Sequence, residues 1–175
     1  WQELRGVPAW VKQALKLDDA IASMAQRYRY MQRCVVLGRG FNYATAFEWS
    51  LKLKEMAYVV AEPYSTADFL HGPIAVVEPG FPVMAVAPQG KVFPSMIEVL
   101  QRVRQDKNAE LVVISDSSRA LELAQSPIPL PGDIPEWLTP IISIVPGQLF
   151  AYHLTLIKGY NPDAPRSLQK ITETI

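Results

Sequence analysis

Three short apolar runs, each followed by turn-forming residues and then by a helical pattern, constrain the fold of this chain most. The runs are Cys34–Leu37, Pro82–Ala87 and Leu111–Ile114. Glycine, proline or serine follows each run and ends the extended segment. Because the hydrophobicity is continuous rather than alternating, both faces of a sheet built from these strands must be covered. The pattern therefore predicts an α/β fold with a parallel sheet sandwiched between helices.

Further elements are predicted from periodicity between and after these runs. They are helices over 42–59 and 92–104, a short strand over 126–130 and a helical region over 134–158. Pro140 and Pro146 are expected to interrupt the last region, because proline cannot donate the backbone hydrogen bond of a helix. The sequence thus alternates strand and helix, as a parallel sheet requires.

The chain divides into three parts. Residues 1–30 carry helical spacing that begins at Pro8, and they are expected to form an amino-terminal helical arm. Residues 31–160 form the predicted α/β domain, and 161–175 are expected to be an extended tail that contains Lys170. The chain begins at Trp1 rather than at methionine, so we expect a fragment of a larger protein.

Charge and cysteine content disfavour several classes of protein. Seventeen basic residues balance seventeen acidic ones, and without a basic run neither nucleic acid nor an acidic membrane surface is an expected partner. The single cysteine, Cys34, cannot form an internal disulfide and is expected to be buried, which fits a reducing compartment. The apolar runs are far shorter than the roughly 20 residues that span a bilayer, and no signal sequence is recognised. We therefore expect a soluble, cytoplasmic protein.

Within the predicted helix 42–59, three charged residues share one narrow face. Glu48, Lys52 and Glu55 are spaced i, i+4 and i+7, while apolar residues cover most of the remaining surface. Carboxylate and amine groups held together can move protons on a carbonyl compound, so this face is a candidate catalytic site. The alternative is a solvated face held by ion pairs, and composition alone favours that alternative.

Gly38, Arg39 and Gly40 follow the first strand, where a doubly wound fold places its ligands. Glycines at this point let backbone N–H groups approach an anion closely. A dinucleotide fingerprint would need a third glycine where Tyr43 stands, so nucleotide binding is disfavoured and a plain tight turn remains an alternative. The serine-rich segment 115–118 can receive a phosphate or cap a helix, and capping is favoured.

The two histidines of the chain differ in their surroundings. His71 stands in a Leu-His-Gly-Pro turn, where it is expected to be exposed enough to titrate. His153 lies among apolar residues of the last helical region and is expected to be a satisfied core or interface residue. Two distant histidines and one strand cysteine form no ligand cluster, so no metal is predicted.

Several ordered motifs together are more specific than any one of them. They are L-G-R-G at 37–40, E-x-x-x-K-L-K-E at 48–55, A-E at 61–62, H-G-P at 71–73 and P-R-x-L-x-K-x-T at 165–172. The set resembles the sugar isomerase (SIS) domain family, and most closely the second SIS half of isomerising glutamine–fructose-6-phosphate aminotransferases. The stretches 40–43 and 65–70 are more similar to SIS-type glucosamine-6-phosphate deaminases.

The resemblance implies a three-layer α/β/α sandwich with a five-stranded parallel sheet, of the flavodoxin-like doubly wound kind. It also implies a two-SIS polypeptide that dimerises, so a preceding SIS domain and a second copy are the expected protein partners. Glu55 matches the family's carboxylate that shuttles a proton between C1 and C2 of a sugar phosphate, with Glu48 and Lys52 as the polar pair beside it. His71 matches the residue that opens the sugar ring in the neighbouring subunit's site. Lys170 matches the tail lysine that forms a Schiff base with the open-chain ketose.

The predicted substrate-binding residues are Gly38, Arg39, Gly40, Ser65 and Thr66. The main phosphate-binding loop of the family belongs to the first SIS half, so little activity is expected of this piece alone. The resemblance predicts a phosphosugar isomerase domain that interconverts fructose 6-phosphate and glucosamine 6-phosphate species, as an aminotransferase-isomerase or as a deaminase, without a cofactor. The alternatives are a phosphosugar sensor that does no chemistry and a structural partner for dimerisation.

Overall fold

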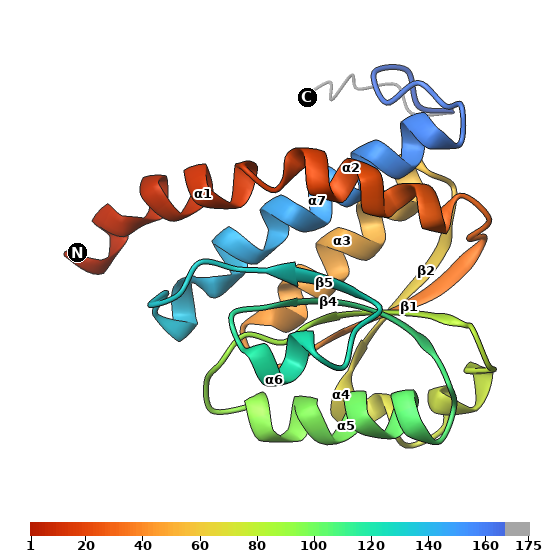
Figure 1. Cartoon of the computed structure of the whole chain (residues 1–175), viewed down its shortest axis with the longest axis horizontal. Coiled ribbons are helices and arrows are strands. Elements are labelled where there is room, and N and C mark those ends of the chain that lie inside the picture. The colour runs from red at the N-terminus through yellow and green to blue at the C-terminus, as the bar shows by residue number, and fades with distance from the viewer. Residues whose placement is uncertain (167–175) are drawn as a thin grey trace, which may run out of the picture.

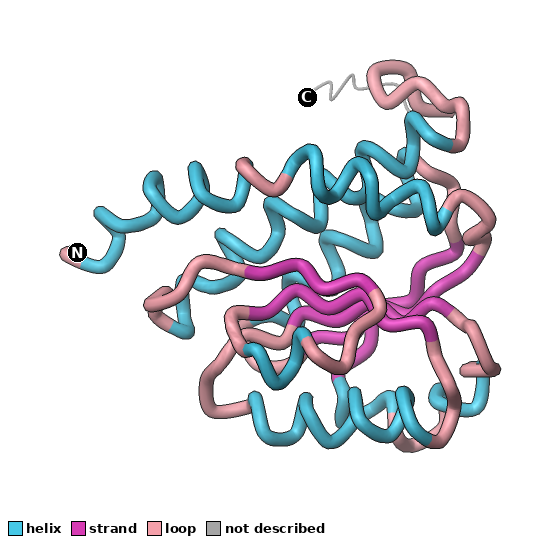
Figure 2. The backbone as a smooth tube through the Cα atoms, in the orientation of Figure 1, coloured by secondary structure: helices cyan, strands magenta, loops and turns pink. Residues whose placement is uncertain are grey.

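The structure, a computed structural model, describes residues 1–166 and contains a sheet between two layers of helices (Figure 1). The strands are β1 Arg33–Gly38, β2 Val60–Ser65, β3 Pro82–Val86, β4 Glu110–Ser115 and β5 Ser126–Pro129 (Figure 2). Neighbouring strands all pair in parallel, in the order β2-β1-β3-β4-β5. This order is that of flavodoxin-like doubly wound sheets, which confirms the predicted fold class. The predicted Schiff-base residue Lys170 lies outside the described residues.

Helices cover both faces of the sheet (Figure 1). One layer contains α1 Val7–Leu15, α2 Asp18–Ala25, α3 Asn42–Met56 and α7 Thr139–Ile157. The other layer contains α4 Thr66–Phe69, α5 Phe93–Gln105 and α6 Ser118–Leu121. Short 3₁₀ turns complete the path: η1 Glu3–Gly6, η2 Gln26–Tyr28, η3 Pro73–Val76 and η4 Glu136–Leu138.

The continuous apolar runs arise because successive residues of each strand enter different cores. Val36 packs into the core beneath α1, α2, α3 and α7, whereas Val35 and Leu37 pack into the core beneath α5. Successive side chains of a strand point to opposite faces, so a sheet covered on both sides needs apolar residues at every position. Cys34 is buried as predicted, and burial raises the pKa of its thiol to about 12, which makes it an unreactive core residue.

Strand β2 is the element that the residue pattern did not predict. Its sequence contains Glu62 and Pro63, neither of which is typical of a buried strand. The strand lies at the edge of the sheet beside β1, where a missing backbone N–H group is tolerated. The edge position therefore explains why β2 lacks the apolar run of the central strands.

Two predicted helix boundaries were wrong. Helix α3 ends at Met56 rather than near residue 59, and Tyr58 adopts a left-handed backbone conformation with φ of 53°. Helix α7 runs unbroken from Thr139 to Ile157. Pro140 occupies its first turn, where no N–H donor is required, and Pro146 is accommodated inside the helix.

Helix α7 also corrects the expectation that every apolar segment is too short to cross a membrane. Together with the preceding turn it forms a segment of 22 residues, Glu136–Ile157, with a mean hydropathy of 1.4 over its most apolar window. By length and composition alone such a helix could span a bilayer. Here α7 packs against α1, α2 and α3 in one layer, which is the composition and setting of a central core helix.

Polar contacts fasten the amino-terminal arm to the domain. The Nε2 atom of His153 on α7 lies 2.6 Å from Oδ1 of Asp18 on α2, so His153 is the satisfied interface residue that was predicted. Arg27 donates from Nε to Oε1 of Glu110 over 2.6 Å, and Tyr28 donates to the same oxygen over 3.1 Å. These contacts join the end of the arm to the start of β4, and thus hold α2 over the sheet.

Candidate active site

The charged residues of α3 form one connected group. Nζ of Lys52 lies 2.8 Å from Oε2 of Glu55 and 3.8 Å from Oε1 of Glu48. All three side chains are partly exposed, with 28% of Lys52, 37% of Glu48 and 30% of Glu55 accessible to solvent. The predicted shared face is therefore confirmed, and both carboxylates remain accessible to a ligand.

The carboxylate of Glu55 raises the pKa of Lys52 above its ordinary value of 10.5, chiefly through their hydrogen bond. Lys52 is therefore an ammonium ion at neutral pH. Because its pKa is higher in the folded state, the pairing stabilises α3 below about pH 10.5 and is lost as the pH rises through the folded value. The ammonium group of Lys52 thus lies within hydrogen-bond distance of the carboxylate of Glu55, the candidate base.

The opposite side of α3 explains why this face points outward. Trp49 and Leu53 are fully buried against the sheet side of the helix. Ser50 is buried as well and donates from Oγ to the carbonyl oxygen of Ala61 on β2 over 2.5 Å. These contacts fix the rotation of the helix. At about 100° per residue, Glu48, Lys52 and Glu55 lie on a different side from the buried residues, so the charged stripe faces solvent.

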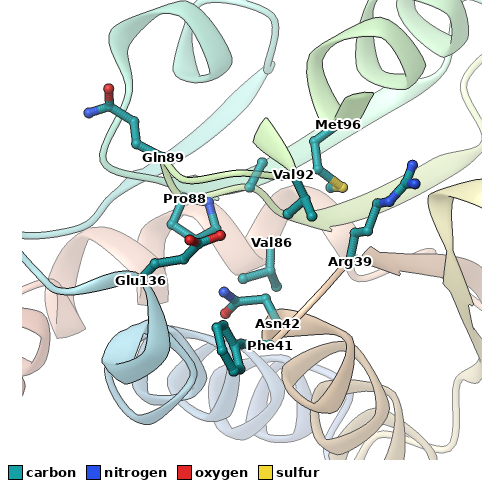
Figure 3. A pocket seen from close by; sticks show the side chains of 10 residues that line it. Arg39, Phe41, Asn42, Val86, Pro88, Gln89, Val92, Met96 and Glu136 are labelled. Carbon is teal, nitrogen blue, oxygen red and sulfur yellow. The ribbon is translucent and has the colours of Figure 1, made fainter. Parts of the chain in front are cut away.

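A crevice opens at the carboxyl ends of β1 and β3, the point at which the strand order reverses (Figure 3). Arg39 and Asn42 line it after β1, and Gln89 lines it after β3. Gly38 lets the chain turn there, since an added Cβ atom would lie 2.3 Å from the carbonyl oxygen of Asn42. Open α/β sheets bind their ligands at this position, so the crevice is the second candidate site.

At this crevice, two carboxylates of the chain itself accept hydrogen bonds from backbone N–H groups. The N–H group of Lys91 donates to Oε1 of Glu136 over 2.9 Å, and that of Gln89 donates to Oδ1 of Asp116 over 2.7 Å. Glu136 reaches the crevice from the turn before α7 and faces Arg39 across it (Figure 3). A phosphate would have to displace Glu136 and would meet its charge, so the crevice is poorly suited to an anionic ligand.

The predicted substrate-binding residues lie at this same edge of the sheet. Gly38 pairs in register with Ser65, so the turn 38–40 and the start of α4 are neighbours. The hydroxyl of Ser65 accepts a hydrogen bond from the N–H group of Ala67 over 3.3 Å and caps α4. Thr66 is fully buried, and its hydroxyl has no partner among the described residues. Substrate binding by these residues stays a prediction.

His71 is exposed, as predicted, but it lies on the other side of the sheet from Glu55. It follows α4, whose residue Phe69 packs into the core beneath α5, whereas Glu55 belongs to α3 in the opposite layer (Figure 1). One copy of the chain therefore does not bring the imidazole and the carboxylate together. Residues 1–166 hold no cluster of three histidine, cysteine, aspartate or glutamate side chains that would suit a metal.

An apolar patch borders the charged stripe, and the exposure of its residues could not be predicted from the sequence pattern. Phe41, Phe47 and Leu51 from the α3 region and Ile141 from α7 are between 41% and 56% accessible. Two shallow grooves join them, and both are lined by Ala44 and Glu48. We call this set the α3–α7 apolar patch. Exposed apolar residues that gather in this way make the patch a candidate interaction surface.

The structure combines a flavodoxin-like sheet with an ion-paired carboxylate stripe on the helix that follows β1. These features define a class of α/β domain, but a fold of this kind hosts many different activities. The sequence profile of the SIS domain matches residues 28–158. The chain therefore belongs to the SIS domain family.

Named relatives share much of the sequence. An isomerising glutamine–fructose-6-phosphate aminotransferase from Pyrococcus horikoshii is 41% identical over 164 residues, which are 94% of this chain and 27% of the relative. Its counterpart from Arabidopsis thaliana is 37% identical over 181 aligned residues, covering 98% of this chain and 26% of the relative. The chain thus spans about a quarter of the length of these relatives.

Solved structures agree with the fold. The C-terminal domain of glucosamine-fructose-6-phosphate aminotransferase from Francisella tularensis superimposes with a TM-score of 0.84 at 30% identity, covering 92% of this chain and 45% of that one. A tagatose-6-phosphate ketose/aldose isomerase from Escherichia coli superimposes with a TM-score of 0.82 at 24% identity, covering 93% and 45% of the two chains. This second likeness concerns the fold alone.

Proposed function

We propose that this chain is one SIS half of an enzyme that interconverts fructose 6-phosphate and glucosamine 6-phosphate species. The observation that carries the proposal is the exposed group on α3, in which Lys52 joins the carboxylates of Glu48 and Glu55. A base held beside a fixed positive charge suits proton transfer between adjacent carbons of a sugar. The 41% identity to an enzyme named for fructose 6-phosphate supports this substrate class.

The proposed chemistry assigns one step to each group. Lys170 adds its amine to the C2 carbonyl of the open-chain ketose and water leaves, which makes the C1 proton more acidic. Ammonia then adds at C2 and the Lys170 amine leaves, which frees the enzyme and leaves the product nitrogen on C2 as an imine. Glu55 accepts the C1 proton of this imine and returns it at C2, while Lys52 stabilises the charge of the carboxylate. His71, supplied by a neighbouring copy, exchanges a proton with the ring oxygen as the sugar opens.

The substrate's phosphate is proposed to bind outside this chain. Glu136 and Asp116 already accept the backbone N–H groups that would hold an anion at the switch-point crevice. A preceding SIS half is the proposed source of the phosphate site, and the α3–α7 apolar patch beside Glu48 is its proposed docking surface. The solved relative from Francisella tularensis is about twice as long as the aligned region, which leaves room for such a half.

Docking at the patch predicts that Leu51→Asp has different effects in two contexts. In the chain described here Leu51 is 41% accessible, so the free energy of unfolding should change by less than about 0.5 kcal/mol. In the full-length protein the new carboxylate would be buried against the preceding half and should cost about 2 kcal/mol or more. Denaturant melts of both forms measure the difference. Val76→Asp, on the other face and 52% accessible, is the matched control, and equal effects of Leu51→Asp in both contexts would refute docking at this patch.

The assay that tests the function uses the full-length protein with glucosamine 6-phosphate and without glutamine. Ammonia release identifies a deaminase, whereas strict dependence on glutamine for the reverse synthesis identifies an aminotransferase. Absence of both activities, with retained binding of sugar phosphate, would favour the sensor function instead.

A further inference from the structure

A groove of about 160 Å³ lies beside β2, the strand at one edge of the sheet (Figure 1). Glu62 of β2 pairs in register with Val35, which packs into the core beneath α5, so both side chains point to the α5 face of the sheet. No residue of α5 lines the groove, so the helix layer leaves this edge open. We call it the β2-edge groove. Its lining includes Arg33, Val60, Glu62, Val76 and Phe81.

The walls of the β2-edge groove are mainly apolar. Val60 and Val76 line it from two separate elements and are 59% and 52% accessible, while Phe81 beside them is almost buried. Apolar walls of this kind favour a ligand with an aliphatic group. A sugar would place hydroxyl groups against the valines without hydrogen-bond partners, which disfavours a sugar phosphate here. The volume is below the roughly 300–1,000 Å³ of sites for drug-sized ligands, so the occupant must be small.

Two opposite charges line the same groove. The guanidinium carbon of Arg33 lies 5.7 Å from the centre of the Phe81 ring, a cation–π contact that restricts its side chain. Glu62 is exposed and stands two residues beyond Val60, the register partner of Arg33. Within residues 1–166, neither Arg33 nor Glu62 forms an ion pair, with the other or with a third residue. The groove therefore presents a fork of N–H donors and a carboxylate to one ligand.

We propose that the β2-edge groove binds a small zwitterion of the α-amino acid class, with its carboxylate on Arg33, its ammonium group on Glu62 and its aliphatic side chain against the two valines. A guanidinium donates paired N–H groups to a carboxylate, and an ammonium group donates to a carboxylate. A simple acid or a simple amine would match only one of the two charges. The groove lies on the opposite face of the sheet from Glu55, so the proposal is independent of the proposed function.

An NMR titration of the 175-residue chain with L-leucine tests this site. The methyl signals of Val60 and Val76 should shift in a saturable manner, because the side chain of the ligand covers both. N-acetyl-L-leucine has no ammonium group, and L-leucinamide has no carboxylate. Each should bind roughly 10-fold more weakly than L-leucine, the effect of one lost charge-assisted hydrogen bond. Shifts that do not saturate, or equal affinity for all three compounds, would overturn the proposal.

Two variants assign the contacts to their residues. Glu62→Gln should abolish the preference for L-leucine over N-acetyl-L-leucine, and Arg33→Gln should abolish the preference over L-leucinamide, because each removes the charge that the missing group would meet. Glu78→Gln is the matched control, since Glu78 is an exposed glutamate outside the groove and its replacement should leave all three affinities unchanged. Unchanged preferences in Glu62→Gln or in Arg33→Gln would contradict binding of the zwitterion between these two side chains.

Discussion

Replacement of Glu55 by glutamine is expected to lower the kcat of the full-length enzyme by about 10²- to 10⁴-fold, the usual contribution of a general base. The amide has nearly the same shape, and its oxygen can still accept a hydrogen bond from Lys52, which now lies 2.8 Å from Oε2. It cannot accept the C1 proton. The KM for the sugar phosphate should change little, because the lost interaction belongs to the transition state.

Glu98→Gln provides the control for Glu55→Gln. Glu98 is an exposed glutamate on α5, in the opposite layer, and its replacement should leave turnover unchanged. Thermal unfolding of both variants checks that the fold is intact. Turnover near the wild-type level in Glu55→Gln would remove the proposed base and leave the stripe on α3 as a set of surface ion pairs.

Trp49→Ala is expected to cause the largest loss of stability, about 3–5 kcal/mol in the free energy of unfolding. The indole is fully buried between the sheet and α7 and meets the ring of Phe150 edge to face, with the centres 5.9 Å apart. It also lies against Gly147, where an added Cβ atom would be 3.1 Å from Trp49 Cγ. Its removal leaves a cavity in the core that fixes the rotation of α3, and the midpoint of urea unfolding measures the cost.

Two further variants separate the cavity from other effects of Trp49→Ala. Trp49→Phe should cost less, because a ring remains and the buried Nε1 atom has no hydrogen-bond partner within residues 1–166 that could be lost. Leu51→Ala, two residues away but 41% accessible, should change the stability only slightly. Similar losses for Leu51→Ala and Trp49→Ala would contradict the assignment of Trp49 to the core of this helix layer.

The fold could be predicted wherever burial alone dictates the sequence. Strands β1, β3 and β4 are covered on both faces and therefore carry continuous apolar runs. Strand β2 was not predicted from the residue pattern, because its edge position permits Glu62 and Pro63. Only the family resemblance implied a fifth strand. The end of α3 was placed too late because Tyr58, just beyond the helix, adopts a left-handed conformation and accepts a hydrogen bond from Arg166, 108 residues away in the sequence.

The candidate site, like the fold, could be predicted from the sequence only in part. Glu48, Lys52 and Glu55 could be grouped because helical spacing is local. The hydrogen bond from the Lys91 N–H group to Glu136 in the crevice could not be predicted. The two residues are 45 positions apart in the sequence and meet only in the tertiary fold. The side of the sheet on which His71 lies follows from the path after β2, the strand that was missed.

We propose that Glu55 of one copy and His71 of another serve the same sugar, and mixed dimers test this proposal most directly. Full-length Glu55→Gln and His71→Gln subunits, each inactive alone, are to be coexpressed and the activity of the mixture measured. In a two-fold dimer each mixed pair then has one site with both residues intact, so random pairing should restore about a quarter of the wild-type activity. A mixture as inactive as either parent would contradict a site shared between copies.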